Sequence, residues 1–208
     1  MSASENMNVK AVLFDMDGVL VESIDAWWNT YNRVCRSQGK PEVSYEDFAY
    51  RLFGGSINED LKYFTEVSRE ELSKMYQEFF LDYIDDVSFI PEARETVDCL
   101  KRRGIKTAVV TNSPKETGHL ILEHVGLKEH LDVIMTGGDV SEGKPSPEII
   151  LKACKILNVK PEEAVLVGDT ENDVKSGRAA GCKVIGVGVD GGDKRIEKVS
   201  ELKRILCD

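Results

Sequence analysis

The sequence predicts an α/β fold: a doubly wound parallel sheet with helices on both faces and an α-helical bundle inserted after the first strand. Two observations lead to this prediction. From residue 91 onward, short continuously apolar runs alternate with helical patterns, which is typical of a parallel sheet covered on both faces. Between residues 22 and 88, apolar residues recur at helical spacing without a strand, so this stretch is predicted to form a small bundle with its own core.

Composition and charge limit the possible partners. The 208 residues suit one or two domains, and 41% hydrophobic with 31% charged residues is ordinary for a globular protein. A net charge of -10 argues against nucleic acid and anionic membranes, which need clustered Lys and Arg. Residues 1–10 lack the basic and apolar regions of a signal peptide, and no later run is long enough to span a membrane. We expect a cytoplasmic monomer or homodimer.

The first half of the chain begins with a buried strand at about residues 9–14 and continues with helices. Apolar residues at three- and four-residue steps between residues 24 and 34 predict a first helix that ends near Gly39. Ser44 is expected to cap a second helix, and a third, short one covers residues 57–64. A capping box beginning at Ser68 predicts a fourth helix, with one apolar face formed by Leu72, Met75, Phe79 and Tyr83.

The second half alternates helix and strand. Strands are predicted at residues 105–110, 133–135, 164–167 and 183–187. Helices are predicted from Pro91 to about residue 103, from a capping box at Ser113 with Pro114 in the first turn, from Ser146 to about 157, and over 172–180. With the first strand this makes five parallel strands. The five cysteines are odd in number, widely spaced and without a C-x-x-C pair, so we expect them to be reduced.

Polar clusters follow four of these strands or lie just beyond them. They are Asp15 with Asp17, Thr111-Asn112-Ser113, Gly143-Lys144-Pro145, and the segment from Gly168 to Asp173. Each cluster alone is ordinary, as a turn, a helix cap or a solvated loop. Because ligands of parallel sheets bind at the carboxyl ends of the strands, the four are expected to meet at one edge. There they would assemble carboxylates, one ammonium and a helix N-terminus around one point.

Phosphoryl transfer through an aspartyl phosphate is the chemistry that needs such a set. A carboxylate that attacks a phosphate dianion is repelled by about 4 kcal/mol for each pair of unit charges about 4 Å apart, at an effective dielectric constant of about 20. A Mg²⁺ ion and Lys144 would offset this repulsion. Oxygen ligands from Asp15, Asp169 and a backbone carbonyl near Asp17 suit this hard ion. Thr111 and Lys144 can stabilise the charge that spreads over the phosphoryl oxygens.

These residues resemble a known family. Asp-x-Asp-Gly-Val at residues 15–19, Thr-Asn-Ser at 111–113, Gly-Lys-Pro at 143–145 and Gly-Asp-x-x-x-Asp at 168–173 are similar to the four motifs of the haloacid dehalogenase superfamily of hydrolases. Order and spacing match over almost the whole chain. The insertion resembles the helical cap of the phosphoglycolate phosphatase and beta-phosphoglucomutase branches. The resemblance implies a Rossmann-like core of residues 1–21 and 89–208 and a cap of residues 22–88.

The resemblance also implies roles for the motif residues. The enzyme would be a magnesium-dependent phosphatase that hydrolyses a small phosphorylated metabolite. In the implied site, Asp15 is the nucleophile and Asp17 the general acid and base. Phosphate is bound by Thr111, Asn112 and Lys144. The Mg²⁺ ion is bound by Asp15, Asp17 and Asp169, and Asp173 is either a further ligand of the ion or a carboxylate that contacts its ligands.

Specificity is expected to come from the cap, through Trp27, Gly54, Gly55 and Ser56, with backbone N–H groups of the loop available to substrate. The related sugar-phosphate mutases carry a histidine near the position of Trp27 and an arginine after their Gly-x-Ser loop. Since both contacts are missing here, a phosphatase is favoured over a phosphomutase. Dehalogenation is disfavoured because those relatives do not use the second aspartate. A non-catalytic binding or regulatory module is the alternative from another class.

Overall fold

Six parallel strands form the central sheet in the order β5-β4-β1-β6-β7-β8. The structure is a computed structural model that describes residues 8–207. The strands are β1 (Ala11–Phe14), β4 (Lys106–Val110), β5 (Val133–Met135), β6 (Ala164–Gly168), β7 (Lys183–Val187) and β8 (Lys194–Ile196). The first strand in the sequence is therefore central, with β4 on one side and β6 on the other.

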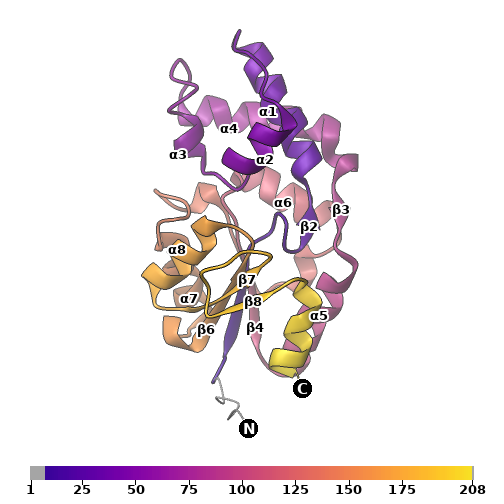
Figure 1. Ribbon diagram of the computed structural model, residues 1–208, viewed down its shortest axis with the longest axis vertical. Coiled ribbons are helices and arrows are strands. Elements are labelled where there is room, and N and C mark those ends of the chain that lie inside the picture. Colours follow the sequence, from indigo (N-terminus) through magenta and orange to yellow (C-terminus); the bar gives the residue numbers. More distant parts are fainter. Residues whose placement is uncertain (1–7, 208) are drawn as a thin grey trace.

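Helices cover both faces of this sheet (Figure 1). Side chains of β1 alternate between them: Ala11 and Leu13 pack with α7 (Glu148–Leu157) and α8 (Glu171–Ala180). Val12 and Phe14 pack on the opposite face with α5 (Pro91–Arg102) and α6 (Lys115–His124). Because both faces are buried, β1 is apolar throughout, which explains why its sequence does not alternate with polar residues.

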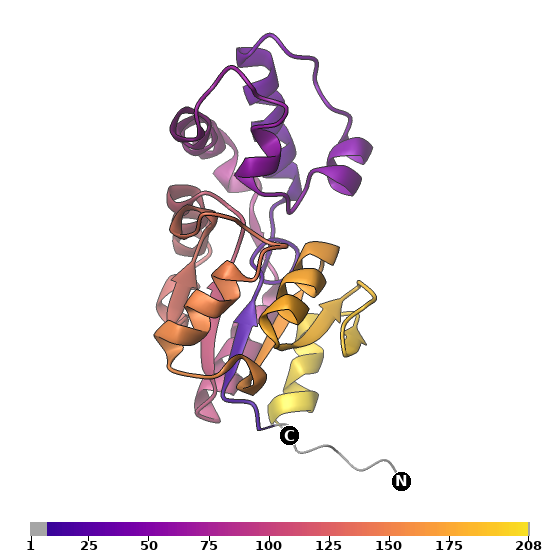
Figure 2. The ribbon, with the colours of Figure 1, turned by 90° about the vertical axis from the view of Figure 1, so that its left-hand side faces the viewer.

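The inserted segment stacks on the sheet domain along the long axis of the molecule (Figure 2). It comprises α1 (Ile24–Ser37), α2 (Tyr45–Arg51), α3 (Ile57–Asp60), α4 (Arg69–Phe80) and the short helix η1 (Leu81–Asp86). A separate hydrophobic core holds these helices together, with Tyr31, Val34, Phe48, Phe64 and Leu72 among its buried residues. We call this segment, from α1 to η1, the cap.

Two short strands join the cap to the sheet domain. β2 (Val21–Glu22) pairs antiparallel with β3 (Ser88–Phe89), so the outgoing and returning chains run side by side. The remaining helical turns are η2 (Lys128–His130), η3 (Gly137–Asp139), η4 (Pro161–Glu163), η5 (Val199–Glu201) and η6 (Lys203–Cys207).

The predicted fold class is confirmed, with differences in detail. Strands β2 and β3 and the edge strand β8 are additional, and the capping box at Ser113 is wrong because Pro114 takes the N-cap position of α6 without a side-chain cap. On α4 the buried face is Leu72, Tyr76 and Phe80 rather than the predicted one. The expectation of reduced cysteines is wrong for Cys99 and Cys207, which form a disulfide. Cys35, Cys154 and Cys182 are free and buried.

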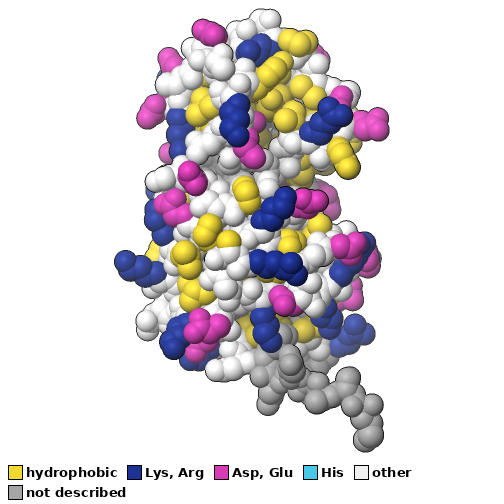
Figure 3. All heavy atoms as spheres, turned by 60° about the vertical axis from the view of Figure 1, so that its left-hand side comes forward, with side chains coloured by type: hydrophobic (Ala, Val, Ile, Leu, Met, Phe, Trp, Pro, Cys, Tyr) yellow, Lys and Arg dark blue, Asp and Glu magenta, His cyan; other side chains and the backbone are white. Residues whose placement is uncertain are grey.

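The surface carries both signs of charge. On the face in Figure 3, Lys and Arg side chains are interspersed with Asp and Glu over both the cap and the sheet domain. Within residues 8–207, no helix combines the length and the apolar character that crossing a membrane requires.

Candidate active site

The carboxyl ends of three adjacent strands bring the sequence motifs together. Asp15 directly follows β1, Thr111 follows β4 and Asp169 follows β6. Because β1 pairs with both β4 and β6, these three chain ends lie next to one another. Lys144 reaches the same place from the loop before α7, where its side chain is buried.

Asp15 is buried against a positive charge. Its Oδ1 accepts a hydrogen bond from the Met16 N–H at 2.7 Å and lies 2.8 Å from Nζ of Lys144. Burial raises the pKa of Asp15 well above its ordinary value, the charge of Asp173 raises it further, and Lys144 works in the opposite direction. The two contacts therefore fix the orientation of the carboxylate. Its burial removes water that would otherwise stabilise the negative charge.

Lys144 bridges two carboxylates. Besides Asp15, its Nζ contacts Oδ1 of Asp173 at 2.7 Å. Burial alone would lower the pKa of Lys144, but the charges of Asp15 and Asp173 raise it above its ordinary value. Oδ2 of Asp173 accepts hydrogen bonds from the backbone N–H of Thr170 at 3.1 Å and from its hydroxyl at 2.5 Å. Asp173, at the N-terminus of α8, thus binds the same ammonium group as Asp15 and helps to position it.

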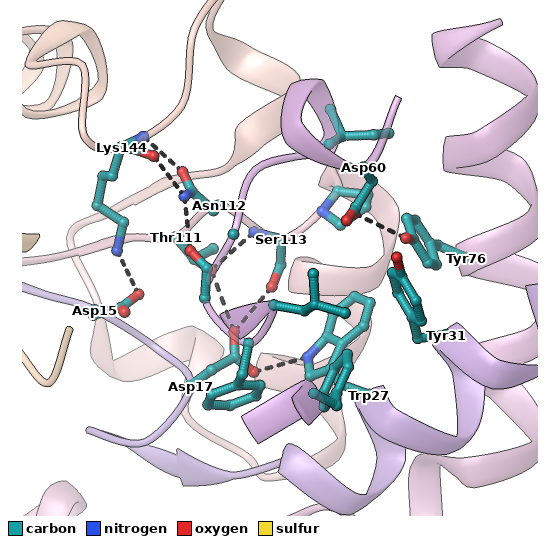
Figure 4. A pocket seen from close by; sticks show the side chains of 17 residues that line it. Asp15, Asp17, Trp27, Tyr31, Asp60, Tyr76, Thr111, Asn112, Ser113 and Lys144 are labelled. Atoms are coloured by element: carbon teal, nitrogen blue, oxygen red, sulfur yellow. Dashed lines mark hydrogen bonds and ion pairs between the residues drawn. The ribbon is translucent and has the colours of Figure 1, made fainter. Parts of the chain in front are cut away.

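Asp17 has different surroundings, made of neutral donors. Oδ1 accepts hydrogen bonds from the hydroxyl of Ser23 and from Nε1 of Trp27, the latter at 3.0 Å. Oδ2 accepts from Oγ of Ser113 at 2.9 Å and from Oγ1 of Thr111 at 3.4 Å. These donors come from the cap hinge, the cap and the segment after β4, so both domains orient this carboxylate (Figure 4).

A third carboxylate completes an acidic cluster. One side-chain oxygen each of Asp15, Asp169 and Asp173 lies within 4.8 Å of the others. Oδ1 of Asp169 is buried without a hydrogen-bond partner among the described residues. Burial, followed by the charge of Asp173, raises the pKa of Asp169 to about 7. Gly18 makes room for this side chain, because it has φ +78° and a Cβ there would collide with Asp169.

This cluster fits a hard divalent cation. It has three carboxylates and a single lysine, and one carboxylate oxygen lacks a partner, so a Mg²⁺ ion would supply both the missing charge and the missing contact. Asp15 and Asp169 are the side chains best placed for it. Both side-chain oxygens of Asp17 accept hydrogen bonds from neutral groups, so its predicted metal contact would fall to its backbone carbonyl.

Asn112 connects the lysine loop with the cap. Its Oδ1 accepts a hydrogen bond from the backbone N–H of Lys144 at 2.7 Å. Its Nδ2 donates to the carbonyl oxygens of Lys144 and of Gly54, each at 3.0 Å. Gly143 is needed at this contact, since a Cβ would collide with the amide of Asn112. The side chain predicted to bind phosphate therefore also positions Lys144.

The cap supplies the far wall of one pocket. Trp27, Gly54 and Gly55 line it together with Asp15 and Asp17 (Figure 4). Ser56 packs instead beside Gly143, with 3.1 Å between its Cβ and the position of an added Cβ there. The expected free N–H groups of the loop are wrong in part, because the N–H of Gly55 donates to the Leu52 carbonyl and that of Ser56 to Glu59.

Several residues of the site are not evident from the sequence. Ser113 belongs to the predicted Thr-Asn-Ser motif and Ser23 lies just inside the predicted cap, but the sequence does not indicate that both donate to Asp17. Proximity to the Asp-x-Asp motif is the available signal for Ser23. Asp60 and Tyr76, which also line the pocket, give no sequence signal, because they lie within ordinary helical patterns.

Comparison with known proteins agrees with this geometry. The family model of the haloacid dehalogenase-like hydrolases matches residues 12–187. The pyrophosphatase PpaX of Bacillus cereus (strain ATCC 10987 / NRS 248) is 32% identical over 213 residues, which cover 97% of this chain and 98% of that protein.

Solved structures share the fold. CbbY from Rhodobacter sphaeroides, in complex with phosphate, has a TM-score of 0.83 at 24% identity, covering 95% of this chain and 99% of that one. The beta-phosphoglucomutase of Clostridium difficile has a TM-score of 0.82 at 21% identity, covering 94% and 93%. With its four motifs at one sheet edge and its family match over most of its length, the chain belongs to the haloacid dehalogenase-like hydrolase family and is an enzyme of the phosphatase type found there.

Proposed function

We propose that this protein is a magnesium-dependent phosphatase that hydrolyses a small phosphorylated metabolite through an aspartyl phosphate on Asp15. The observation that carries the proposal is the fixed carboxylate of Asp15 at the end of β1, which lines the pocket and is paired with Lys144. Both of its fixed contacts use Oδ1. We therefore assign the attack on phosphorus to Oδ2.

The reaction divides into two steps. In the first, Oδ2 of Asp15 forms a bond to phosphorus while the bond from phosphorus to the ester oxygen breaks, and protonated Asp17 gives its proton to that oxygen. In the second, Asp17 takes a proton from water, the water oxygen bonds to phosphorus, and the acyl phosphate bond breaks to release phosphate. Lys144 and Thr111 hold the phosphoryl oxygens during both steps.

A bound Mg²⁺ would neutralise phosphoryl charge as Asp15 approaches. Asp15, Asp169 and the backbone carbonyl of Asp17 would hold it, with Asp173 behind Lys144. The division into cap residues 22–88 and core residues 1–21 and 89–208 is part of this proposal. The cytoplasmic location and the monomeric or homodimeric state stay predictions.

Hydrolysis of p-nitrophenyl phosphate with and without Mg²⁺ tests the proposal. We expect turnover that thorough chelation abolishes, and that the Asp15→Asn variant lacks because an amide cannot form the acyl phosphate. The variant should melt at or above the temperature of the wild type, since one buried negative charge is gone. Activity of purified Asp15→Asn protein, or turnover without a divalent ion, would refute the mechanism.

A phosphomutase is the second candidate, favoured by the fold shared with a beta-phosphoglucomutase. The core chemistry would be the same, and only the group that accepts the phosphoryl would differ. Incubation with beta-glucose 1-phosphate, with and without a bisphosphate primer, separates the two. Glucose 6-phosphate that forms faster than free phosphate would replace the phosphatase assignment.

A further inference from the structure

The cap end of the pocket holds an acidic side chain that the proposed mechanism does not use. Asp60, the last residue of α3, lines the same pocket as Asp15 and Asp17. The hydroxyl of Tyr76 donates to its Oδ2 at 2.8 Å, and the phenol of Tyr31 lies beside them (Figure 4). Burial is the main cause that raises the pKa of Asp60 to about 7, against the opposing hydrogen bond from Tyr76.

Five aromatic side chains line the pocket together with Asp60. They are Trp27, Tyr31, Phe48, Phe53 and Tyr76. Among the described residues that line the pocket, Lys144 is the only lysine or arginine, and it is already paired with Asp15 and Asp173. The cap end therefore offers an incoming group a carboxylate and aromatic surface, but no cation.

The charge of Asp60 would affect which leaving groups fit this end of the pocket. When the phosphoryl group of an ester lies at Asp15, its leaving group extends toward the cap. A second anion, whether a carboxylate or another phosphate, would be repelled by Asp60, whose partly buried carboxylate is screened less by water than one on the surface. An ammonium group would instead donate to the carboxylate and contact the electron-rich faces of the surrounding rings.

We propose that the substrate is the phosphate monoester of a short amino alcohol, with Asp60 as the residue that binds its ammonium group. The inference rests on the phosphatase function proposed above and names its substrate class. Tyr76 acts as a positioning residue, since its hydroxyl fixes Oδ2 of Asp60 and leaves Oδ1 for the ligand.

Three esters that differ at one end test the proposal. They are 2-aminoethyl phosphate, 2-hydroxyethyl phosphate and 2-phosphoglycolate, which end in a cation, a neutral hydroxyl and an anion. For the wild type we expect kcat/KM to fall in that order, with about tenfold or more between the first and the last. Equal turnover of the amino and hydroxyl esters, or a preference for 2-phosphoglycolate or pyrophosphate, would overturn the proposal.

The Asp60→Asn variant keeps the shape of the side chain and the acceptor for Tyr76. We expect its kcat/KM for 2-aminoethyl phosphate to fall about tenfold and that for 2-phosphoglycolate to rise. Glu78→Gln is the matched control, because it removes the same charge from an exposed position of α4 that forms only a surface pair with Lys74. It should keep the wild-type ranking. A ranking in Asp60→Asn that equals that of the wild type contradicts the role of Asp60.

Binding measurements separate this inference from the phosphatase function. Calorimetry on the Asp15→Asn protein should rank 2-aminoethyl phosphate above 2-phosphoglycolate without any turnover, and adding Asp60→Asn should remove the difference. The reverse ranking overturns the inference even if p-nitrophenyl phosphate is hydrolysed. Absence of that hydrolysis in the wild type is instead a failure of the proposed function. Unfolding curves of each variant establish that it is folded.

Discussion

Asp15 and Asp17 lie two residues apart, but the fold gives their carboxylates different surroundings. Asp15 faces the ammonium of Lys144 and lies near two other carboxylates. Asp17 faces hydroxyl and indole donors. In the first arrangement Lys144 opposes the burial and the negative charges that raise the pKa of Asp15, which suits a group that attacks as a carboxylate. The second arrangement holds the orientation of a group that exchanges a proton in the proposed mechanism.

Replacing Asp17 by Asn tests this division of roles. We expect turnover of alkyl phosphates to fall about 10²- to 10⁴-fold, because no acid protonates the leaving oxygen. The loss should shrink for aryl phosphates with acidic phenols, whose oxygens leave without a proton. A series of substituted phenyl phosphates measures this dependence. A loss that is uniform over the series would assign Asp17 to metal binding instead.

The partly buried carboxyl of Asp60 leads to a prediction about stability and pH. Its pKa in the folded state is about 7, above the ordinary 3.8, so protonation stabilises the fold at low pH and this contribution is lost as the pH rises through about 7. The free energy of unfolding of Asp60→Asn, relative to that of the wild type, should therefore increase as the pH rises from about 5 to about 8.

Urea unfolding of both proteins at the two pH values measures the difference. Tyr76 can still donate to the asparagine oxygen, so the variant loses little at low pH. A difference between the proteins that is the same at both pH values would show that Asp60 is ionised throughout.

At the scale of elements, the N-terminus of α4 is attached to the sheet domain. Arg69 donates to the carbonyl oxygens of Gly137 at 2.8 Å, Ser141 at 3.2 Å and Val140 at 3.3 Å. Nδ2 of Asn58 donates to the same Ser141 carbonyl at 3.0 Å. Together with the contact of Asn112 to Gly54, these bonds hold the cap over the pocket. The two-strand connection of β2 and β3 lies next to Asp17 and can act as the hinge.

Replacing Arg69 by Ala should favour the open cap. We expect kcat/KM for small esters to fall about tenfold, since several hydrogen bonds from a charged donor are lost, and small-angle scattering should report a longer molecule. Arg51→Ala is the control, because this exposed side chain pairs only within α2, with Asp47 at 3.5 Å. Unchanged scattering and kinetics in the Arg69 variant would exclude a closing role.

At the scale of the whole molecule, the sequence predicts the sheet, the insertion and the motif residues at one edge. Buried strands and helix caps leave local patterns, as the caps at Ser44 and Ser68 illustrate. The edge strand β8 could not be predicted, because Lys194 and Arg195 face solvent and the strand therefore lacks an apolar run. The hydrogen bond from Ser113 to Asp17 could not be predicted either, because a cap and a hydrogen bond to a distant carboxylate use the same hydroxyl.

Contacts between distant segments account for the remaining omissions. Asp60 meets Tyr76 across 16 residues, and Cys99 meets Cys207 across 108. No periodicity records such pairs, since each partner fits its own helix or terminus without the other. The cap end of the pocket is formed by such contacts between distant segments. The phosphate site could therefore be predicted from the sequence, but the specificity residues only in part.

The central claim is that Asp15 carries the phosphoryl group, and trapping that intermediate tests it most directly. The Asp17→Asn variant, which lacks the base for the second step, is incubated with an aryl phosphate and reduced with borohydride, which converts an aspartyl phosphate to homoserine. Peptide mass spectrometry should place homoserine at position 15 and nowhere else. Homoserine at another aspartate, or a burst of phenol with Asp15 left unmodified, would contradict the account.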